Sequence, residues 1–270
     1  MSMKTRIISA ILALLVFLPM LYYGSWPLMI GVMLLSLMAI REFFQMHQEK
    51  MTFGPAGLIA LATLVLSGGN QLLNHLQLPI AVQPFDLYYI LAISCLAFTV
   101  FHPEWDFDRI SVYLLAAVYV GFGFNSILTL RDRGFMAILG LFLIVWATDS
   151  FAYFVGRSFG RHKLAPHISP NKTIEGSVGG SLIAVVVFMV FNSYTRAFEL
   201  SHLQAFLAAL FVSVLGQLGD LVESAFKRHY QVKDSGEFLP GHGGVLDRFD
   251  SLLFASVGMQ VVLALVNQLF

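Results

Sequence analysis

The chain has 270 residues, of which 57% are hydrophobic and only 12% are charged, and its mean hydropathy is +0.76. A soluble domain usually carries about 25% charged residues, so the composition excludes an ordinary soluble protein and indicates an integral membrane protein. The formal net charge of zero gives no electrostatic support for nucleic-acid binding. Cys95 is the only cysteine, which excludes an intrachain disulfide and a cysteine-based metal site.

Nine apolar stretches approach the roughly 20 residues that a helix needs to cross a bilayer. We therefore expect an all-α, polytopic membrane protein with about nine transmembrane helices, folded as a single membrane domain over residues 1–270. The first stretch follows Lys4 and Arg6 and imitates a signal peptide, but no small-residue cleavage site follows it, which favours an uncleaved helix. The stretches are 7–23, 26–40, 55–73, 87–101, 110–130, 135–155, 177–194, 204–223 and 251–269.

Lysine and arginine are divided unequally between the two sides of such a bundle. With nine spans, 13 of the 16 basic residues fall on the side of the N-terminus, and only Arg131, Arg133 and Arg196 fall on the other. The positive-inside rule makes the basic side cytoplasmic. The longest polar loops, about 156–176 and 224–250, lie on that same side, so both can contribute to one shared site.

Charges at the boundaries of the early spans are expected to be solvated. They lie where a helix leaves the membrane. These residues are Arg41 and Glu42 after the second span, and Glu104, Asp106 and Asp108 before the fifth.

Candidate site residues lie on either side of the first polar loop. Asp149 lies near the end of the sixth span, and Lys172 and Thr173 precede the seventh. A lysine there could reach a phosphate, because a helix N-terminus favours anions. The glycines that follow could support this role or permit close helix packing, and the two are compatible. These glycines are Gly176, Gly179 and Gly180.

The eighth span ends in a polar stripe. Asp220, Glu223, Ser224 and Lys227 are three, four and seven residues apart, so they share one face of a helix. Acidic residues at the end of a membrane span are costly, which makes each a candidate site residue. Glu223 could instead form an ion pair with Lys227.

Basic residues and aspartates alternate in the second polar loop. A basic run beside a membrane helix often only satisfies the positive-inside rule or attracts anionic lipids. Interleaved aspartates add nothing to such a cluster, so their presence favours phosphate and metal chemistry. The basic residues are Lys227, Arg228, Lys233 and Arg248, and the aspartates are Asp234, Asp247 and Asp250.

The turn at 240–244 contains little side-chain bulk apart from His242. Glycines such as Gly243 and Gly244 let the backbone approach a ligand and present N–H groups to phosphate oxygens. The turn could equally be a plain connection between helices. His242 could donate to a phosphate, act as an acid or merely cap the turn.

Asp247 and Asp250 face the same way at the start of the last span and, together with Asp220, could hold a divalent cation. Mg²⁺ typically takes one or two carboxylates plus substrate phosphates. Helix capping explains one of the two aspartates but not readily both. Asp149 and Glu223 are further candidate ligands.

These segments resemble those of the phosphatidate cytidylyltransferases, also called CDP-diacylglycerol synthases. The match is specific from about 146 to 254, which is the expected catalytic part, and the N-terminal half is similar in hydropathy alone. Ile174 stands where many members carry tryptophan. The matching residues are Ser224, Lys227, Arg228, Lys233, Asp234, Pro240 to Gly244, Asp247, Arg248 and Asp250, with the segments 149–157 and 169–176.

The resemblance implies the reaction of CTP with phosphatidate to give CDP-diacylglycerol and pyrophosphate, with Mg²⁺ and an optional second cation, in a bacterial inner membrane. It also implies a homodimer and a cytoplasm-facing polar cavity, with Asp220 and Asp247 as metal ligands. Lys227, Arg228 and Asp250 are expected to complete the catalytic set. The expected substrate-binding residues are Lys172, Thr173, Ser224, Lys233, His242, Gly243, Gly244 and Arg248.

Two other functions remain open from the residues alone. A CTP-dependent lipid-alcohol kinase would use the same nucleotide but release CDP. A transporter or channel would also place charges within membrane spans.

Overall fold

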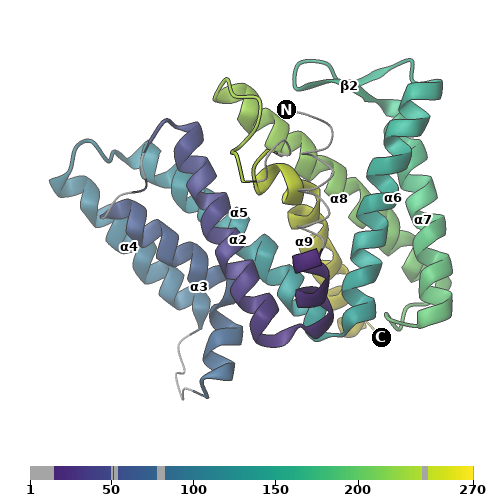
Figure 1. Cartoon of the computed structure of the whole chain (residues 1–270), viewed down its shortest axis with the longest axis horizontal. Coiled ribbons are helices and arrows are strands. Elements are labelled where there is room, and N and C mark those ends of the chain that lie inside the picture. The colour runs from purple at the N-terminus through teal and green to yellow at the C-terminus, as the bar shows by residue number, and fades with distance from the viewer. Residues whose placement is uncertain (1–14, 50, 52–53, 78–82, 239–242, 270) are drawn as a thin grey trace. The chain divides into compact units, whose positions relative to one another are not determined.

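The computed structural model describes residues 15–49, 51, 54–77, 83–238 and 243–269 (Figure 1). Within these residues, eight helices are long and apolar enough to cross a membrane, which confirms a polytopic, predominantly helical protein. Each coincides with one predicted stretch. Residues 15–23 of the first predicted stretch are helical, and its remainder lies outside the described residues. The eight helices are α2 (Ser25–Met46), α3 (Pro55–His75), α4 (Pro84–Phe101), α5 (Phe107–Asp132), α6 (Phe135–Phe159), α7 (Ile174–Thr195), α8 (His202–His229) and α9 (Leu246–Leu269).

The chain divides into two compact units, which we describe separately. The first comprises Met1–Leu128 and Asp234–Arg248, and the second comprises Thr129–Lys233 and Phe249–Phe270. Helices α5 and α9 each begin in the first unit and continue into the second. The single membrane domain expected from the sequence stays a prediction.

Two aromatic rings stack in the core of the first unit. The rings of Phe44 on α2 and Tyr113 on α5 stack with their centroids 4.0 Å apart, and both side chains are fully buried. The Tyr113 hydroxyl donates to Glu49, which also pairs with Arg109 at 2.6 Å. The expected solvated charges Glu104, Asp106 and Asp108 are indeed exposed.

In the second unit, α6 and α7 pack against each other along their length (Figure 1). A Cβ atom at Gly176 would lie 2.6 Å from the backbone oxygen of Ala152, and one at Gly180 would lie 2.6 Å from that of Thr148. The two backbones can approach this closely only because glycine has no side chain. The close-packing role predicted for these glycines is therefore confirmed.

A chain of buried hydroxyl groups joins α6, α7 and α8 within the second unit. The Ser213 hydroxyl lies 2.7 Å from that of Thr148 and 2.9 Å from that of Ser181. Gln217 donates its side-chain amide to the Ser181 hydroxyl at 2.8 Å. Polar side chains that bond across helices in this way hold membrane bundles together where hydrophobicity alone cannot.

A small antiparallel hairpin is an addition to the expected helices. It consists of β1 (Lys163–Ala165) and β2 (Ser169–Thr173), and it ends directly at the start of α7. Thr173 caps this helix by accepting a hydrogen bond from the N–H of Gly176 at 3.1 Å. Glu175 holds the segment that leads into the other strand by accepting hydrogen bonds from the backbone N–H groups of Arg161 and His162. The hairpin thereby fixes Lys172 one residue before the helix cap.

Candidate active site

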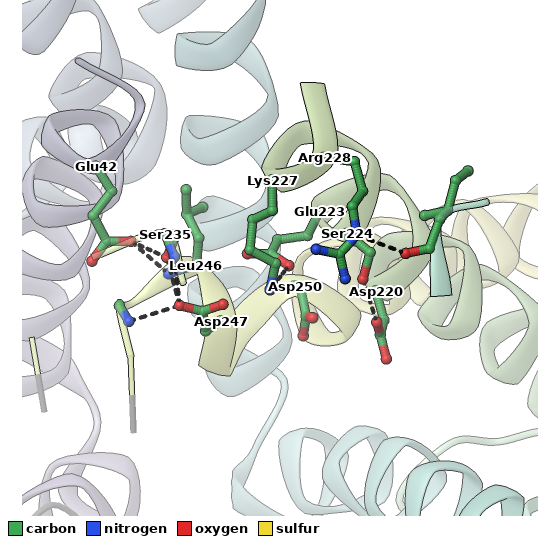
Figure 2. Close-up of polar contacts among 12 residues, drawn as sticks. Glu42, Asp220, Glu223, Ser224, Lys227, Arg228, Ser235, Leu246, Asp247 and Asp250 are labelled. Carbon is green, nitrogen blue, oxygen red and sulfur yellow. Dashed lines mark hydrogen bonds and ion pairs between the residues drawn. The ribbon is translucent and has the colours of Figure 1, made fainter. Parts of the chain in front are cut away.

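The polar face of α8 forms ion pairs within the second unit. Lys172 of the hairpin reaches Asp220, with its ammonium nitrogen 2.6 Å from Oδ2, and both side chains are about one-third exposed. The Ser224 hydroxyl donates to Oδ1 of the same aspartate at 3.4 Å, as Figure 2 shows. The structure thus joins three residues that were predicted to belong to one site.

Two further carboxylates lie near Asp220. Asp149 on α6 interacts electrostatically with Asp220 and Lys172, and Asp250 on α9 interacts with Asp220, Asp149 and Lys227. Acidic residues from three helices, all within the second unit, therefore lie in one neighbourhood. Like charges repel, and this repulsion favours a cation between them.

The chemistry of these donors fits a magnesium ion, which prefers carboxylate oxygens. In the part of the chain that the structure describes, no group of three or more His, Cys, Asp or Glu side chains is arranged to hold a metal. Mg²⁺ commonly needs only one or two carboxylates, because substrate phosphates and water supply its remaining ligands. In the structure, Asp220 is paired with the Lys172 ammonium.

Glu223 forms an ion pair with Lys227, which was predicted from the sequence as an alternative to a site role. Its side chain is 2% exposed and pairs with Lys227 at 2.5 Å, one helical turn later. Arg228 is bonded as well, since its Nε donates to the backbone oxygen of Ile168 in the hairpin turn at 3.2 Å. The basic residues at the end of α8 are therefore tied to neighbouring groups of the second unit, whereas Lys233 is exposed.

Asp247, one residue into α9, belongs to the first unit. Its Oδ2 atom accepts three hydrogen bonds, from the N–H of Gly244 at 2.8 Å, from the N–H of Ser235 at 2.8 Å, and from the Ser235 hydroxyl at 2.9 Å (Figure 2). Gly243 adopts a φ of +79°, which favours glycine, and allows the loop to turn against Asp247. Arg248 is exposed, and His242 lies outside the described residues.

The prediction for Glu42 is wrong. The sequence predicted a solvated boundary charge, but this side chain is 4% exposed and accepts hydrogen bonds from the N–H groups of Val245 and Leu246. Its partners lie about 200 residues away in the sequence, so no local pattern could reveal them. The only available signal was the acidic residue at the end of a membrane span, which is the criterion that singled out Asp220.

The sequence is similar to known proteins along almost its whole length. A model of the cytidylyltransferase family matches residues 4–266. A phosphatidate cytidylyltransferase of Staphylococcus haemolyticus is 42% identical over 268 residues, which cover 97% of this chain and 99% of that protein. One of Bacillus subtilis is 39% identical over 270 residues, which cover 98% of this chain and 99% of that protein. The resemblance seen in the polar loops is confirmed, and the chain belongs to the cytidylyltransferase family.

Proposed function

We propose that this protein is a phosphatidate cytidylyltransferase, which transfers the cytidylyl group of CTP to phosphatidate and releases pyrophosphate. The observation that carries this proposal is the 39–42% identity, over nearly the full length, to relatives that bear that name. The structure supports it by gathering carboxylates and a lysine at the end of α8, where a charged nucleotide and a lipid phosphate would need them.

The reaction forms a bond between a phosphatidate phosphate oxygen and the α-phosphorus of CTP. The bond from that phosphorus to the bridging oxygen of the β-phosphate breaks, and pyrophosphate leaves with the electron pair. A phosphate dianion is already a nucleophile, so the enzyme needs no strong general base. Transfers of this kind depend on positioning and on neutralisation of charge.

Carboxylates are proposed to hold the metal. Asp220 and Asp247 are the principal ligands, and Asp250, Asp149 and Glu223 are further candidates. A bound Mg²⁺ supplies positive charge that neutralises the triphosphate, and a second cation, monovalent or divalent, is compatible with this acidic set. In the structure, the Lys172 ammonium holds Asp220.

Basic and small residues are proposed to bind the substrates. Lys172 can exchange the Asp220 carboxylate for a substrate phosphate, because an ammonium forms equivalent bonds to either oxygen. Lys227 and Arg228 contribute positive charge at the end of α8. The remaining proposed substrate contacts are Thr173, Ser224, Lys233, His242, Gly243, Gly244 and Arg248.

The proposal extends to the setting of the enzyme. The distribution of Lys and Arg supports a cytoplasmic N-terminus and a polar cavity that opens to the cytoplasm, in the inner membrane of a bacterium. We also propose a homodimer and a single membrane domain, in which residues 146–254 carry the chemistry.

The test uses the purified full-length protein in detergent with phosphatidate and CTP labelled at the α-phosphorus. We expect label in CDP-diacylglycerol, release of pyrophosphate, and loss of both when EDTA is added. In a parallel assay with a lipid alcohol in place of phosphatidate, release of CDP with a phosphorylated lipid would instead identify a kinase. An absence of turnover in detergent would contradict an enzymatic function and favour transport, since detergent leaves no compartment to transport across.

A further inference from the structure

Glu42 is a buried charge that the proposed chemistry does not use. Its side chain lies near the end of α2, a candidate membrane span, and is only 4% exposed. A carboxylate removed from water is costly unless hydrogen bonds replace its hydration. The hydrogen bonds that stabilise the buried Glu42 carboxylate therefore indicate its role in the protein.

The described contacts come from three residues of the first unit, Ser235, Val245 and Leu246. Oε1 accepts the N–H of Val245 at 2.6 Å, and Oε2 accepts the N–H of Leu246 and the Ser235 hydroxyl, each at 2.9 Å. The N–H groups at the start of a helix carry partial positive charge and favour a carboxylate. Glu42 thus fixes the first residues of α9 from a helix near the other end of the sequence.

The glycines of this loop fit around the same carboxylate. A Cβ atom at Gly236 would lie 2.8 Å from Oε1 of Glu42, and one at Gly244 would lie 2.5 Å from it. A larger residue at either position would have to displace the carboxylate. The described part of the glycine-rich loop therefore packs directly against the Glu42 side chain.

Ser235 links Glu42 to Asp247. Its hydroxyl lies 2.9 Å from a carboxylate oxygen of each, and its single proton can be donated to only one of them at a time. The backbone N–H groups of Ser235 and Gly244 both bond to Oδ2 of Asp247. One oxygen of Asp247 is consequently held by Ser235, which also bonds Glu42, as Figure 2 shows, and by Gly244, whose neighbour Val245 bonds Glu42.

We infer that Glu42 is a positioning residue, which orients the Asp247 carboxylate for metal binding without touching the metal or the substrates. The inference rests on the proposed function, because Asp247 serves as a metal ligand only there. Hydrogen-bond partners behind a ligand fix its orientation and tune its affinity for the metal.

The test is Glu42→Gln in the full-length protein. Glutamine keeps the size of the side chain, but its NH₂ group cannot accept the N–H bond that one carboxylate oxygen accepts. We expect the Mg²⁺ concentration for half-maximal turnover to rise about 10-fold or more. We also expect Mg²⁺ to raise the Tm of the wild type, and this increase to be lost in the variant at Mg²⁺ concentrations that saturate the wild type.

Glu49→Gln is the matched control. Glu49 is a second carboxylate of the first unit, and its described partners are Arg109 and Tyr113. Its loss is expected to lower the Tm while leaving the dependence on Mg²⁺ unchanged. An equal change in Mg²⁺ dependence in both variants would refute a specific role for Glu42.

Ser235→Ala supplies a second test that leaves Glu42 in place. It removes the shared hydroxyl, so we expect a smaller rise in the Mg²⁺ requirement, and no additional rise when it is combined with Glu42→Gln. If Glu42→Gln does not accumulate in the membrane, an unchanged Mg²⁺ dependence in Ser235→Ala overturns the inference. If the wild type makes no CDP-diacylglycerol, the proposed function fails, and the effect of Mg²⁺ on the Tm still tests Glu42.

Discussion

Replacing Gly180 by alanine tests whether the approach of α6 and α7 shapes the site. The new Cβ atom would lie 2.6 Å from the backbone oxygen of Thr148 and 2.9 Å from the backbone nitrogen of Ala152, whereas ordinary contacts begin at 3.4 Å. Neither atom can rotate away, so the two helices must separate by about 0.8 Å, and overpacking of this kind costs about 1–3 kcal/mol.

The matched control is Gly57→Ala on α3. A Cβ atom there meets nothing within 4 Å, so alanine is expected to stabilise the helix by about 0.5–1 kcal/mol. For a chain of this size, a loss of about 2 kcal/mol at Gly180 corresponds to a decrease in Tm of about 4–8 °C. Thermal unfolding of the purified variants in detergent, followed by tryptophan fluorescence, measures both changes.

The same substitution is expected to lower activity. Thr148 and Ala152 flank Asp149, so separating the helices moves that carboxylate away from Lys172, with which it interacts. We expect kcat to fall in Gly180→Ala and to remain unchanged in Gly57→Ala. A Gly180→Ala variant as stable and as active as Gly57→Ala would refute the packing argument.

Three other substitutions test individual contacts. Asp247→Asn is expected to insert normally but to lose about two or more orders of magnitude in turnover, and near-wild-type activity would contradict its proposed role as a metal ligand. Lys227→Met removes the cation from Glu223, which is 2% exposed, and should cost about 3–5 kcal/mol by thermal unfolding; adding Glu223→Gln should restore most of this loss. Ser213→Ala removes the hydroxyl that contacts both Thr148 and Ser181 and should cost about 0.6–2 kcal/mol, whereas an unchanged Tm would show that this network is not stabilising.

The helices were predictable because a bilayer imposes a length and a composition on every span. The stripe from Asp220 to Lys227 followed from helical spacing, and the pair formed by Glu223 and Lys227 needed no other part of the chain. In each case, the physical cause lies within one short segment.

Features that depend on distant segments were missed or left undecided. The hairpin strands of three and five residues are too short and too polar to show a clear alternation of hydrophobic residues. Asp220 was predicted to be a site residue, but its pairing with Lys172 appears only when the hairpin is placed beside α8. Glu42 was predicted wrongly because its environment is created by the loop that precedes the last helix.

The contact between Glu42 and Ser235 also has a consequence for biosynthesis. The two residues are 193 positions apart, so at typical rates of translation the glutamate is made roughly 10–40 s before its partner. During that interval the nascent chain carries a carboxylate near the membrane boundary without the backbone groups that later bind it. Completion of the C-terminal region therefore stabilises a helix that was among the first to be synthesised.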